Sequence, residues 1–372
     1  MNPKENTYYQ RQLLLPEVGL KGQAKLKNGK VLVIGAGGLG CPVLQYLAAA
    51  GIGHLGIVDG DVVEMSNLHR QVLYHVGSLG KNKAMEAQKI LSLLNPNINI
   101  MATPVHLTPE NAIEIMQGYN IVVDCSDNYE TRFLVNDVAV LNNTPLVYGS
   151  IYRFEGQVSV FNYNNGPTYR CLFPKFPKSE ANTNCSLAGV IGILPGIIGI
   201  LQANEVIKLV LNQGEVLSGK ILTYQSLKNG FEVYELRKNA MFSYAELLKG
   251  GQVHRENYYA ACSNSSGHEN ITAKDLLESV YSHEYLVLDV REPSEEPLFL
   301  AKGVVNIPLV ELSTRMNEIP TDQKIAVICK SGIRSRKAID IFHQHERSNI
   351  IKNLDQGITI EFIKEWKRKQ KK

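Results

Sequence analysis

The sequence lacks the features by which secreted and membrane proteins are usually recognised. It has only six cysteines in 372 residues, scattered without regular spacing, which excludes a disulfide-rich scaffold. The first residues, Met-Asn-Pro-Lys-Glu-Asn, show no signal-peptide pattern. We therefore expect a soluble globular protein of the reducing cytoplasm.

The sequence also has little excess charge and no long apolar run. Its 39 basic and 36 acidic residues leave a net charge of +3, too small for a broad field that recruits nucleic acid or membranes. The longest apolar stretch, residues 187–201, is shorter than a membrane span and contains Pro195, so it predicts a buried helix. The basic run at 364–372 is typical of a solvated tail, and nucleic-acid binding is not expected.

What the chain does have is alternation of short apolar strands and helices. Strands are predicted over 30–34, 55–58 and 121–123, and helices over 42–50 and 81–94. This order is typical of an α/β, Rossmann-like domain with a mostly parallel sheet covered on both faces. Alternating patterns at 157–161 and 220–236 predict antiparallel additions, which make the sheet mixed.

The length and a change of composition predict two domains. The first is expected to span residues 1–240. A linker is expected over 241–270, because residues 258–270 are poor in large aliphatics and rich in small polar groups. The second, a smaller α/β domain over 271–372, is predicted to contain strands at 286–290 and 325–329, a helix at 273–280 capped by Thr272, and a helix at 334–343.

A glycine-rich turn follows the first predicted strand. Gly35, Gly37 and Gly40 satisfy G-x-G-x-x-G, with Gly38 inside the same turn. Missing side chains let phosphate oxygens approach backbone N–H groups at a helix start, and Asp59 at the end of the next strand suits ribose hydroxyls. By themselves these features are most typical of a nicotinamide or flavin oxidoreductase.

Charged and amide side chains beyond the turn favour a triphosphate instead. They are Asp61, Asn67, Arg70, Gln71 and Lys83 after the second strand, and Asp127-Asn128 after the strand at 121–123. Arg and Lys neutralise the charge on phosphoryl oxygens, and an Asp at a strand end suits Mg²⁺. Either cation alone is more typical of a solvated surface, but the cluster predicts ATP binding.

These motifs occur in the order found in one family. They are Arg11-Gln12, Leu15-Pro16-Glu17-Val18-Gly19, the Gly35–Gly40 turn, Asp59-Gly-Asp61, Ser66-Asn67-Leu68-His69-Arg70-Gln71, Gly80-x-x-Lys83, Asp124-Cys-Ser-Asp127-Asn128 and Gly156-Gln157. Over residues 5–238 the chain resembles the MoeB/ThiF family, bacterial relatives of ubiquitin-activating enzymes that adenylate sulfur-carrier proteins.

The resemblance implies roles for individual residues. Asp59 would bind the ribose, while Asn67, Arg70 and Lys83 contact the phosphates, Asp127 positions magnesium, and the glycine turn, Asp61 and Asn128 complete the nucleotide site. Arg11 would reach the nucleotide of a second subunit, which implies a homodimer. The substrate would be a small ubiquitin-like carrier whose C-terminal Gly-Gly carboxylate attacks the α-phosphate of ATP. That carboxylate is already ionised at neutral pH, so no general base is expected.

Cysteine usage needs comment at two places. One departs from the family pattern, and at the other the family's members differ in whether the cysteine is essential. Many relatives hold zinc between two Cys-x-x-Cys pairs, but here the first pair is Thr168-Tyr-Arg-Cys171 and no second pair occurs near 239–244. A tetrahedral thiolate site needs four ligands, so we predict no zinc. Cys185 stands at the position of the family's conserved cysteine, before the apolar helix. It is either a small structural residue or a thiol activated by the helix N-terminus.

A second reactive cysteine lies near the end of the chain. Cys329 closes a predicted strand and is followed by Lys-Ser-Gly-Ile-Arg-Ser, where backbone amides, a helix dipole and Arg334 would stabilise a thiolate or persulfide. A cysteine phosphatase loop has five residues between Cys and Arg, whereas this loop has four. With 288–292, 306–309 and 353–357, the segment resembles a rhodanese domain, although the usual Gly-His-Ile-Pro-Gly is replaced at 299–303.

Together the two resemblances imply a fused adenylyltransferase and sulfurtransferase. Cys329 would receive sulfur from a donor such as a cysteine desulfurase, and its persulfide would expel AMP from the carrier adenylate. Cys185 is the candidate thiol for releasing the carrier thiocarboxylate from the resulting acyl disulfide. The alternatives are a ubiquitin-like conjugation activator with a thioester on Cys185, an NAD-dependent oxidoreductase and a non-catalytic scaffold. The pathway, whether thiamine, molybdopterin, cysteine or tRNA thiolation, is left open.

Overall fold

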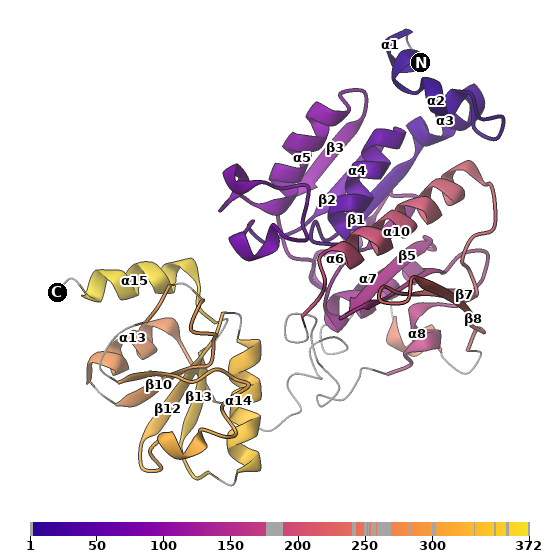
Figure 1. Ribbon diagram of the computed structural model, residues 1–372. Coiled ribbons are helices and arrows are strands. Elements are labelled where there is room, and N and C mark those ends of the chain that lie inside the picture. The colour runs from indigo at the N-terminus through magenta and orange to yellow at the C-terminus, as the bar shows by residue number, and fades with distance from the viewer. Residues whose placement is uncertain are drawn as a thin grey trace. The chain divides into compact units, whose positions relative to one another are not determined.

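The chain forms two compact units (Figure 1), Met1–Cys262 and Ser263–Lys372. The computed structural model describes residues 3–175, 189–239, 243–248, 251, 253, 258, 269–282, 284–295, 297–299, 303–330, 332–345, 347–354 and 357–370. The expected linker, 241–270, lies mostly outside this set, and two of its described tyrosines belong to the first unit and pack within it. The Tyr244 hydroxyl donates to Thr168 Oγ1 at 2.8 Å, and the buried Tyr258 hydroxyl donates to Asp137 Oδ2 at 2.8 Å.

The first unit is built on an eight-stranded mixed sheet of order β3-β2-β1-β4-β5-β6-β7-β8. The first five strands of that order are parallel, and β6, β7 and β8 add in antiparallel fashion, as the sequence predicted. The strands are β1 Lys30–Ile34, β2 His54–Val58, β3 Asn99–Thr103, β4 Ile121–Asp124, β5 Leu146–Tyr152, β6 Glu155–Phe161, β7 Lys220–Gln225 and β8 Gly230–Glu235.

Helices cover both faces of this sheet. Those of the described residues are α1 Pro3–Tyr8, α2 Gln10–Leu13, α3 Gly19–Asn28, α4 Gly40–Ala50, α5 Lys83–Leu94, α6 Ala112–Met116, α7 Tyr129–Leu141, α8 Tyr169–Leu172, α10 Ile193–Leu211 and α11 Tyr244–Leu247, with short 3-10 turns at Met65–Asn67 and Val76–Ser78. The strand β1 shows why two cores form. Val31 and Val33 pack with α4, α5 and α10, whereas Leu32 and Ile34 face α6 and α7, because successive side chains alternate across a strand.

The apolar helix lies later in the sequence than predicted. α10 begins at Ile193 and not at 187, and residues 187 and 188 lie outside the described part of the chain. It is long and apolar enough to cross a membrane by length and composition alone. In this structure it packs against α4 and the sheet, with Leu194, Ile198 and Val206 fully buried in the first core.

The second unit contains a five-stranded parallel sheet of order β11-β10-β12-β13-β9. Its elements are β9 Glu269–Ile271, α13 Ala273–Ser282, β10 Tyr285–Asp289, β11 Val304–Asn306, a 3-10 turn at Met316–Glu318, β12 Lys324–Ile328, α14 Ile333–Gln344, β13 Ile351–Leu354 and α15 Ile360–Gln370. Thr272 caps α13 as predicted, because its Oγ1 accepts a hydrogen bond from the Asp275 amide at 3.2 Å.

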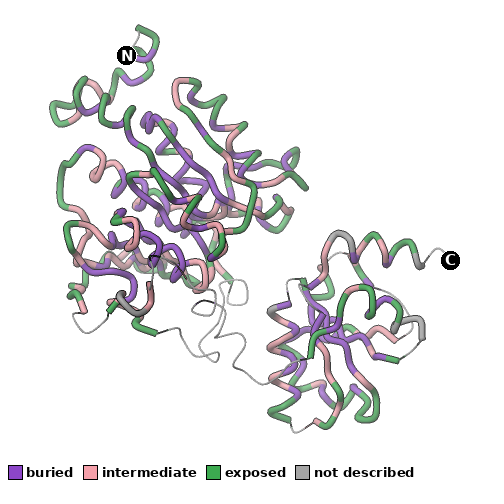
Figure 2. Tube along the Cα trace, turned by 180° about the vertical axis from the view of Figure 1, so that it is seen from behind, coloured by how far each residue is buried: buried purple, intermediate pink, exposed green. Residues whose placement is uncertain are grey.

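Alternation along β12 again separates two cores. Ile325, Val327 and the following Cys329 pack with α14, whereas Ala326 and Ile328 face α13 and α15. Figure 2 shows the buried residues of each unit concentrated in its strands and in the inner faces of its helices. Cys329 thus directly follows a strand that is buried on both faces, which fixes the backbone from which its loop departs.

Candidate nucleotide and sulfur sites

The glycine turn of the first unit joins β1 to α4 and needs glycine at two positions. Gly35 has φ +94°, and a Cβ there would lie 2.8 Å from the Cys125 carbonyl oxygen. A Cβ on Gly40 would lie 2.0 Å from the Gly35 carbonyl oxygen. The turn therefore folds tightly onto the end of β4. It borders a cavity of about 460 Å³, which is lined by Gly35, Gly37 and Gly38 among others.

Asp59, at the end of β2, holds the turn in place. Its Oδ2 accepts from the Ala36 amide at 2.8 Å, and its Oδ1 accepts from the Asp61 amide at 2.8 Å. Burial raises the pKa of this carboxyl above its usual range, and the nearby Lys83 ammonium and the two amides counteract part of that rise. Asp59 lines the cavity, so its carboxylate is both a structural acceptor and an accessible polar group.

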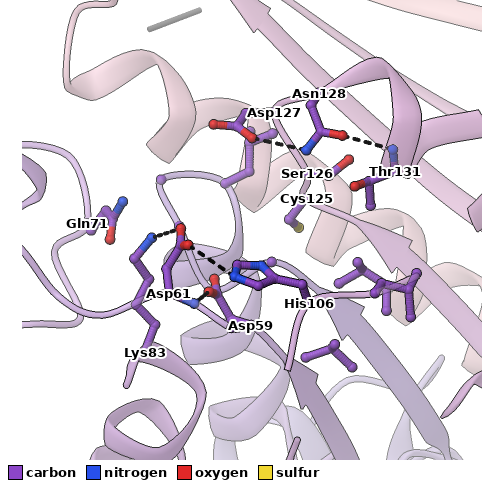
Figure 3. Close-up of a pocket in the computed structure, with 18 of the residues that line it drawn as sticks. Asp59, Asp61, Gln71, Lys83, His106, Cys125, Ser126, Asp127, Asn128 and Thr131 are labelled. Carbon is purple, nitrogen blue, oxygen red and sulfur yellow. Dashed lines mark hydrogen bonds and ion pairs between the residues drawn. The ribbon is translucent and has the colours of Figure 1, made fainter. Parts of the chain in front are cut away.

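Lys83 begins α5 and points its ammonium at the carboxylate of Asp61, which follows β2 (Figure 3). Its Nζ lies 2.8 Å from Asp61 Oδ2, and only 9% of its side chain is exposed against 58% for Asp61. Burial lowers the pKa of Lys83, but the negative charges of Asp59 and Asp61 outweigh burial, and the pKa is raised overall. Lys83 is therefore a fixed cation at one wall of the cavity.

The loop after β4 supplies the opposite polar groups. Asp127 is exposed and lines the cavity, and the Asn128 Nδ2 donates to its Oδ1 at 3.5 Å. Asn128 also caps α7, since its Oδ1 accepts from the Thr131 amide at 2.8 Å (Figure 3). The cap fixes the direction of the loop, so Asp127 is presented to the cavity from the start of a helix.

Most of the residues predicted for nucleotide binding line one cavity. They are Gly35, Gly37, Gly38, Asp59, Asp61, Arg70, Lys83, Asp127 and Asn128. Asn67 does not line it, because its Oδ1 accepts from the Glu64 amide at 3.1 Å and closes a capping box. Arg11 lies on α2 and does not line the cavity of its own chain. Cys185 lies outside the described residues.

Sequence analysis missed two side chains of this cavity. His106, after β3, places its Nε2 3.9 Å from Asp61 Oδ1. Arg132, one turn into α7, is buried, donates to the Ser126 carbonyl at 3.1 Å and lies over the Tyr148 ring at 5.6 Å. No local sequence motif marks either residue. The only signal is for Arg132, which lies four residues after the cap Asn128 and so on the same face of the helix.

A smaller cavity of about 230 Å³ adjoins the first. The two share Asp127, Arg132 and Ile151, and the smaller is otherwise lined mainly by aromatic side chains (Tyr129, Tyr148, Tyr152, Tyr169 and Phe173) and by Gly156. The Tyr169 hydroxyl is buried and has no hydrogen-bond partner. Ser150, Glu155 and Gln157 also line this cavity, so an aromatic channel with some polar groups leads to the place where Asp127 and Arg132 lie.

In the second unit the sulfur of Cys329 is buried and held by residues of α14 and β13. The Ser335 amide donates to Sγ at 3.3 Å, and the Ser335 hydroxyl lies 3.3 Å from it. That hydroxyl donates to Asn353 Oδ1 at 2.6 Å, and the Asn353 Nδ2 donates to Asn270 Oδ1 at 3.1 Å. Arg334, predicted to stabilise the sulfur, instead directs its guanidinium at Glu295.

Cys171, the single cysteine left in the region expected to lack zinc, is held by backbone amides. Its Sγ accepts from the Thr168 and Asn239 backbone N–H groups, both at 3.3 Å. Within the described part of the chain, no group of three or more His, Cys, Asp or Glu residues could hold a metal ion. Absence of zinc stays a prediction.

The order of these elements matches known families. A model described as the ThiF family matches residues 9–243, more than half of the chain. The chain belongs to the ThiF family. A model described as a rhodanese-like domain matches residues 272–366, so the ThiF domain and the rhodanese-like domain correspond to the first and second units.

Two relatives of this ThiF-family chain match it over different lengths. The adenylyltransferase and sulfurtransferase MOCS3 of Xenopus laevis is 41% identical over 361 residues, covering 90% of this chain and 80% of the relative. A sulfur carrier protein adenylyltransferase of Thermus thermophilus is 52% identical over 236 residues, covering 62% of this chain and 87% of the relative.

Among solved structures, MccB of E. coli, crystallised with ATP, has 23% identity and a TM-score of 0.57 over 64% of this chain and 74% of that one. This likeness confirms the α/β fold. The two family matches and the relatives confirm the predicted class, an adenylyltransferase and sulfurtransferase.

Proposed function

We propose that the first unit uses ATP and Mg²⁺ to adenylate the C-terminal glycine of a small ubiquitin-like sulfur carrier. Cys329 of the second unit then supplies sulfur as a persulfide. The carrier carboxylate attacks the α-phosphate and pyrophosphate leaves. The persulfide attacks the acyl-adenylate and AMP leaves, which gives an acyl disulfide. A second thiol then attacks the Cys329 sulfur of that disulfide, so the carrier thiocarboxylate leaves and a disulfide between the two thiols forms, which an external thiol reduces. The observation that carries the proposal is the single cavity in which the glycine turn, Lys83 and Asp127 meet.

Three features of the cavity fit a nucleoside triphosphate. The turn offers backbone N–H groups at the start of α4, and Lys83 and Arg70 line the same wall as cations. The buried Gln71 Oε1 lines the cavity and has no hydrogen-bond partner, so it suits a donor such as an amino or hydroxyl group of the ligand.

The residues present also fit Mg²⁺. This ion prefers oxygen ligands and is commonly held by one or two carboxylates together with substrate phosphates. Asp127 provides an exposed carboxylate at the cavity, and the described residues contain no larger acidic cluster that would bind the ion alone. Bound there, the ion would neutralise phosphate charge during displacement, while Asn128 keeps the Asp127 carboxylate oriented.

The smaller cavity suits the tail of the carrier. A chain ending in two glycines is narrow enough for the aromatic channel beside Gly156, and the channel reaches the part of the nucleotide cavity where Arg132 lies. The guanidinium of Arg132 would hold the terminal carboxylate, since Arg pairs with carboxylates through parallel hydrogen bonds. Only the last residues of the carrier would have to enter.

We further propose a homodimer in which Arg11 serves the partner's nucleotide. Arg11 does not line its own cavity. Three leucines near it, Leu14, Leu15 and Leu20, are 69%, 52% and 64% exposed, which is unusual for side chains so close together and supports a covered surface. For sulfur loading we propose a cysteine desulfurase, and for thiocarboxylate release Cys185.

The decisive experiment supplies the full chain with Mg-ATP and each small Gly-Gly-ended protein of the same genome. ATP–pyrophosphate exchange measures the first step, and intact mass measures conversion of the carrier to a thiocarboxylate. Cys329→Ala is expected to exchange pyrophosphate normally and to form no thiocarboxylate. Asp127→Asn is expected to lose both, whereas Asp322→Asn, which removes an exposed acidic charge of the second unit, loses neither.

The outcomes separate this proposal from its competitors. Thiocarboxylate formation by the Cys329→Ala variant at an undiminished rate would exclude the role of the loop. A carrier thioester that survives on the enzyme and disappears in Cys185→Ala would favour a conjugation activator. Absence of pyrophosphate exchange with every carrier offered would contradict adenylation itself.

A further inference from the structure

A bidentate ion pair stands beside the reactive loop of the second unit. Arg334 lies in the first turn of α14, and Glu295 lies in the loop after β10. Both terminal nitrogens of the guanidinium pair with the carboxylate, the Nη2–Oε2 distance being 2.7 Å. The two side chains are only 20% and 29% exposed. Such fork-to-fork pairs are stronger than ordinary surface ion pairs.

The surrounding groups keep this pair charged. Burial raises the pKa of Glu295, but its hydrogen bonds with Arg334 and with the Glu292 amide outweigh burial and lower the pKa overall. The hydrogen bonds to Glu295 raise the pKa of Arg334, although burial lowers it in part. Arg334 directly precedes Ser335, whose amide contacts the sulfur, yet Glu295 occupies the donors of the guanidinium.

Among the described residues, the sulfur accepts a hydrogen bond from the Ser335 amide and none from Arg334. The Ser335 hydroxyl also lies 3.3 Å from the sulfur, but its proton is donated to Asn353. A small sulfur donor such as thiosulfate carries two negative charges and would need the Arg334 fork for its sulfonate oxygens. The carboxylate of Glu295 competes for the same nitrogens and adds a repulsive charge.

We propose that Glu295 is a specificity residue for sulfur loading, which restrains the use of small anionic donors by occupying the guanidinium of Arg334. The inference rests on the proposed function of Cys329 as sulfur acceptor. In loading from thiosulfate, the Cys329 thiolate attacks the outer sulfur, the donor S–S bond breaks, and sulfite leaves with the bonding electron pair. A Cys329 persulfide anion forms, and no further oxidant or reductant is needed.

The test is steady-state sulfur transfer from thiosulfate to cyanide by the full chain, followed as thiocyanate. Glu295→Gln is expected to lower the KM for thiosulfate about tenfold, because a charge-assisted competitor is lost, with a smaller change in kcat. The gain should shrink as salt is raised. It should vanish in the double variant Glu295→Gln/Arg334→Met, because the freed guanidinium is then absent.

A matched control lies in the same unit. Glu318 forms a similar bidentate pair with Arg315, at 2.7 and 2.8 Å, away from the loop. Glu318→Gln is expected to leave the KM for thiosulfate unchanged. Glu295→Ser gives a second neutral variant should the Gln variant fail to fold, and Glu295→Asp retains the charge and should resemble the unaltered protein.

Two results would overturn the inference. One is an unchanged KM in both neutral Glu295 variants while Cys329→Ala is inactive. The other is an equal gain in the Glu318→Gln control. If Cys329→Ala remains fully active, the assignment of Cys329 as the sulfur acceptor fails instead, so the two failures are distinguished.

Discussion

Replacing Lys83 by methionine tests the electrostatics of the nucleotide cavity most directly. Methionine keeps the length and much of the apolar stem but removes the ammonium that lies 2.8 Å from Asp61. Removing one preorganised positive group from the site of developing phosphoryl charge costs about 10²–10³ in rate, or about 2.7–4 kcal/mol. We expect the upper part of this range, because Lys83 is only 9% exposed and water has little access to replace it.

The variant also leaves two carboxylates without their shared cation. Asp59 is half-buried and Asp61 is exposed, and both line the cavity, so both would repel the incoming phosphates. In an Asp61→Asn background the same Lys83 substitution should therefore cost less. A coupling of about 1 kcal/mol is expected, as is usual for residues in contact.

The assay is carrier-dependent ATP–pyrophosphate exchange at saturating Mg-ATP, repeated across ATP concentrations to separate kcat from KM. Lys81→Met is the control, because Lys81 is 45% exposed and pairs with Glu86 at 3.2 Å outside the cavity. It should change the rate less than the Lys83 variant by about two orders of magnitude. An exchange rate in Lys83→Met within threefold of the control, with the fold intact by circular dichroism, would refute the assignment.

Three further predictions concern stability and pH. Gly40→Ala should destabilise the first unit by about 1–3 kcal/mol and abolish nucleotide-induced thermal stabilisation, because the new Cβ would lie 2.0 Å from the Gly35 carbonyl. Gly196→Ala in α10, with nothing within 4 Å, should be neutral or stabilising, and equal effects would contradict the clash. Arg170→Met should cost about 3–5 kcal/mol in urea unfolding, because the fully buried Asp137 loses its bidentate partner. A loss under 1 kcal/mol would show that the hydrogen bonds from Asn136 and Tyr258 suffice. Burial raises the pKa of Glu86, but the Ser78 hydroxyl and Lys81 outweigh it and lower the pKa overall, so its stabilisation is present above pH 4.5 and is lost as the pH falls below that value. Glu86→Gln should flatten the acid side of the stability–pH curve, and an unchanged slope between pH 3 and 5 would contradict this.

The parts of the structure that sequence predicted well are those decided by neighbours in the chain. The strands β1, β2 and β4 follow from short apolar runs, and the turn at Gly35 follows from glycine spacing. Parallel strands bring their carboxyl ends to one edge, so Asp59 and Asp127 could be expected in one site before any coordinates were known. The start of α10 was placed too early because apolar composition does not mark a helix end.

The parts that could not be predicted depend on pairs that are distant in sequence. Asn67 was expected at the phosphates, but its side-chain amide closes a local capping box. Asparagine is suited to either role, so the residue type alone could not decide between them. Arg334 was expected at the sulfur, but it pairs with Glu295, which lies 39 positions earlier in the sequence. No residue pattern in the cysteine loop predicts this partner. Arg132 could not be assigned to the site from sequence, because its place there depends on its contact with Tyr148, which lies on another element.

The hydrogen bonds that run from Asn270 through Asn353 and Ser335 to Cys329 have a practical consequence for dissecting the chain. A recombinant fragment that starts at Ile271 would retain every residue of the cysteine loop. It would lose Glu269 and Asn270 of β9, the edge strand of the sheet, and with Asn270 the side-chain amide that orients Asn353. Two fragments, one that includes Asn270 and one that begins after it, should therefore differ in the reactivity of the Cys329 thiol towards an alkylating reagent, although their cysteine loops are identical.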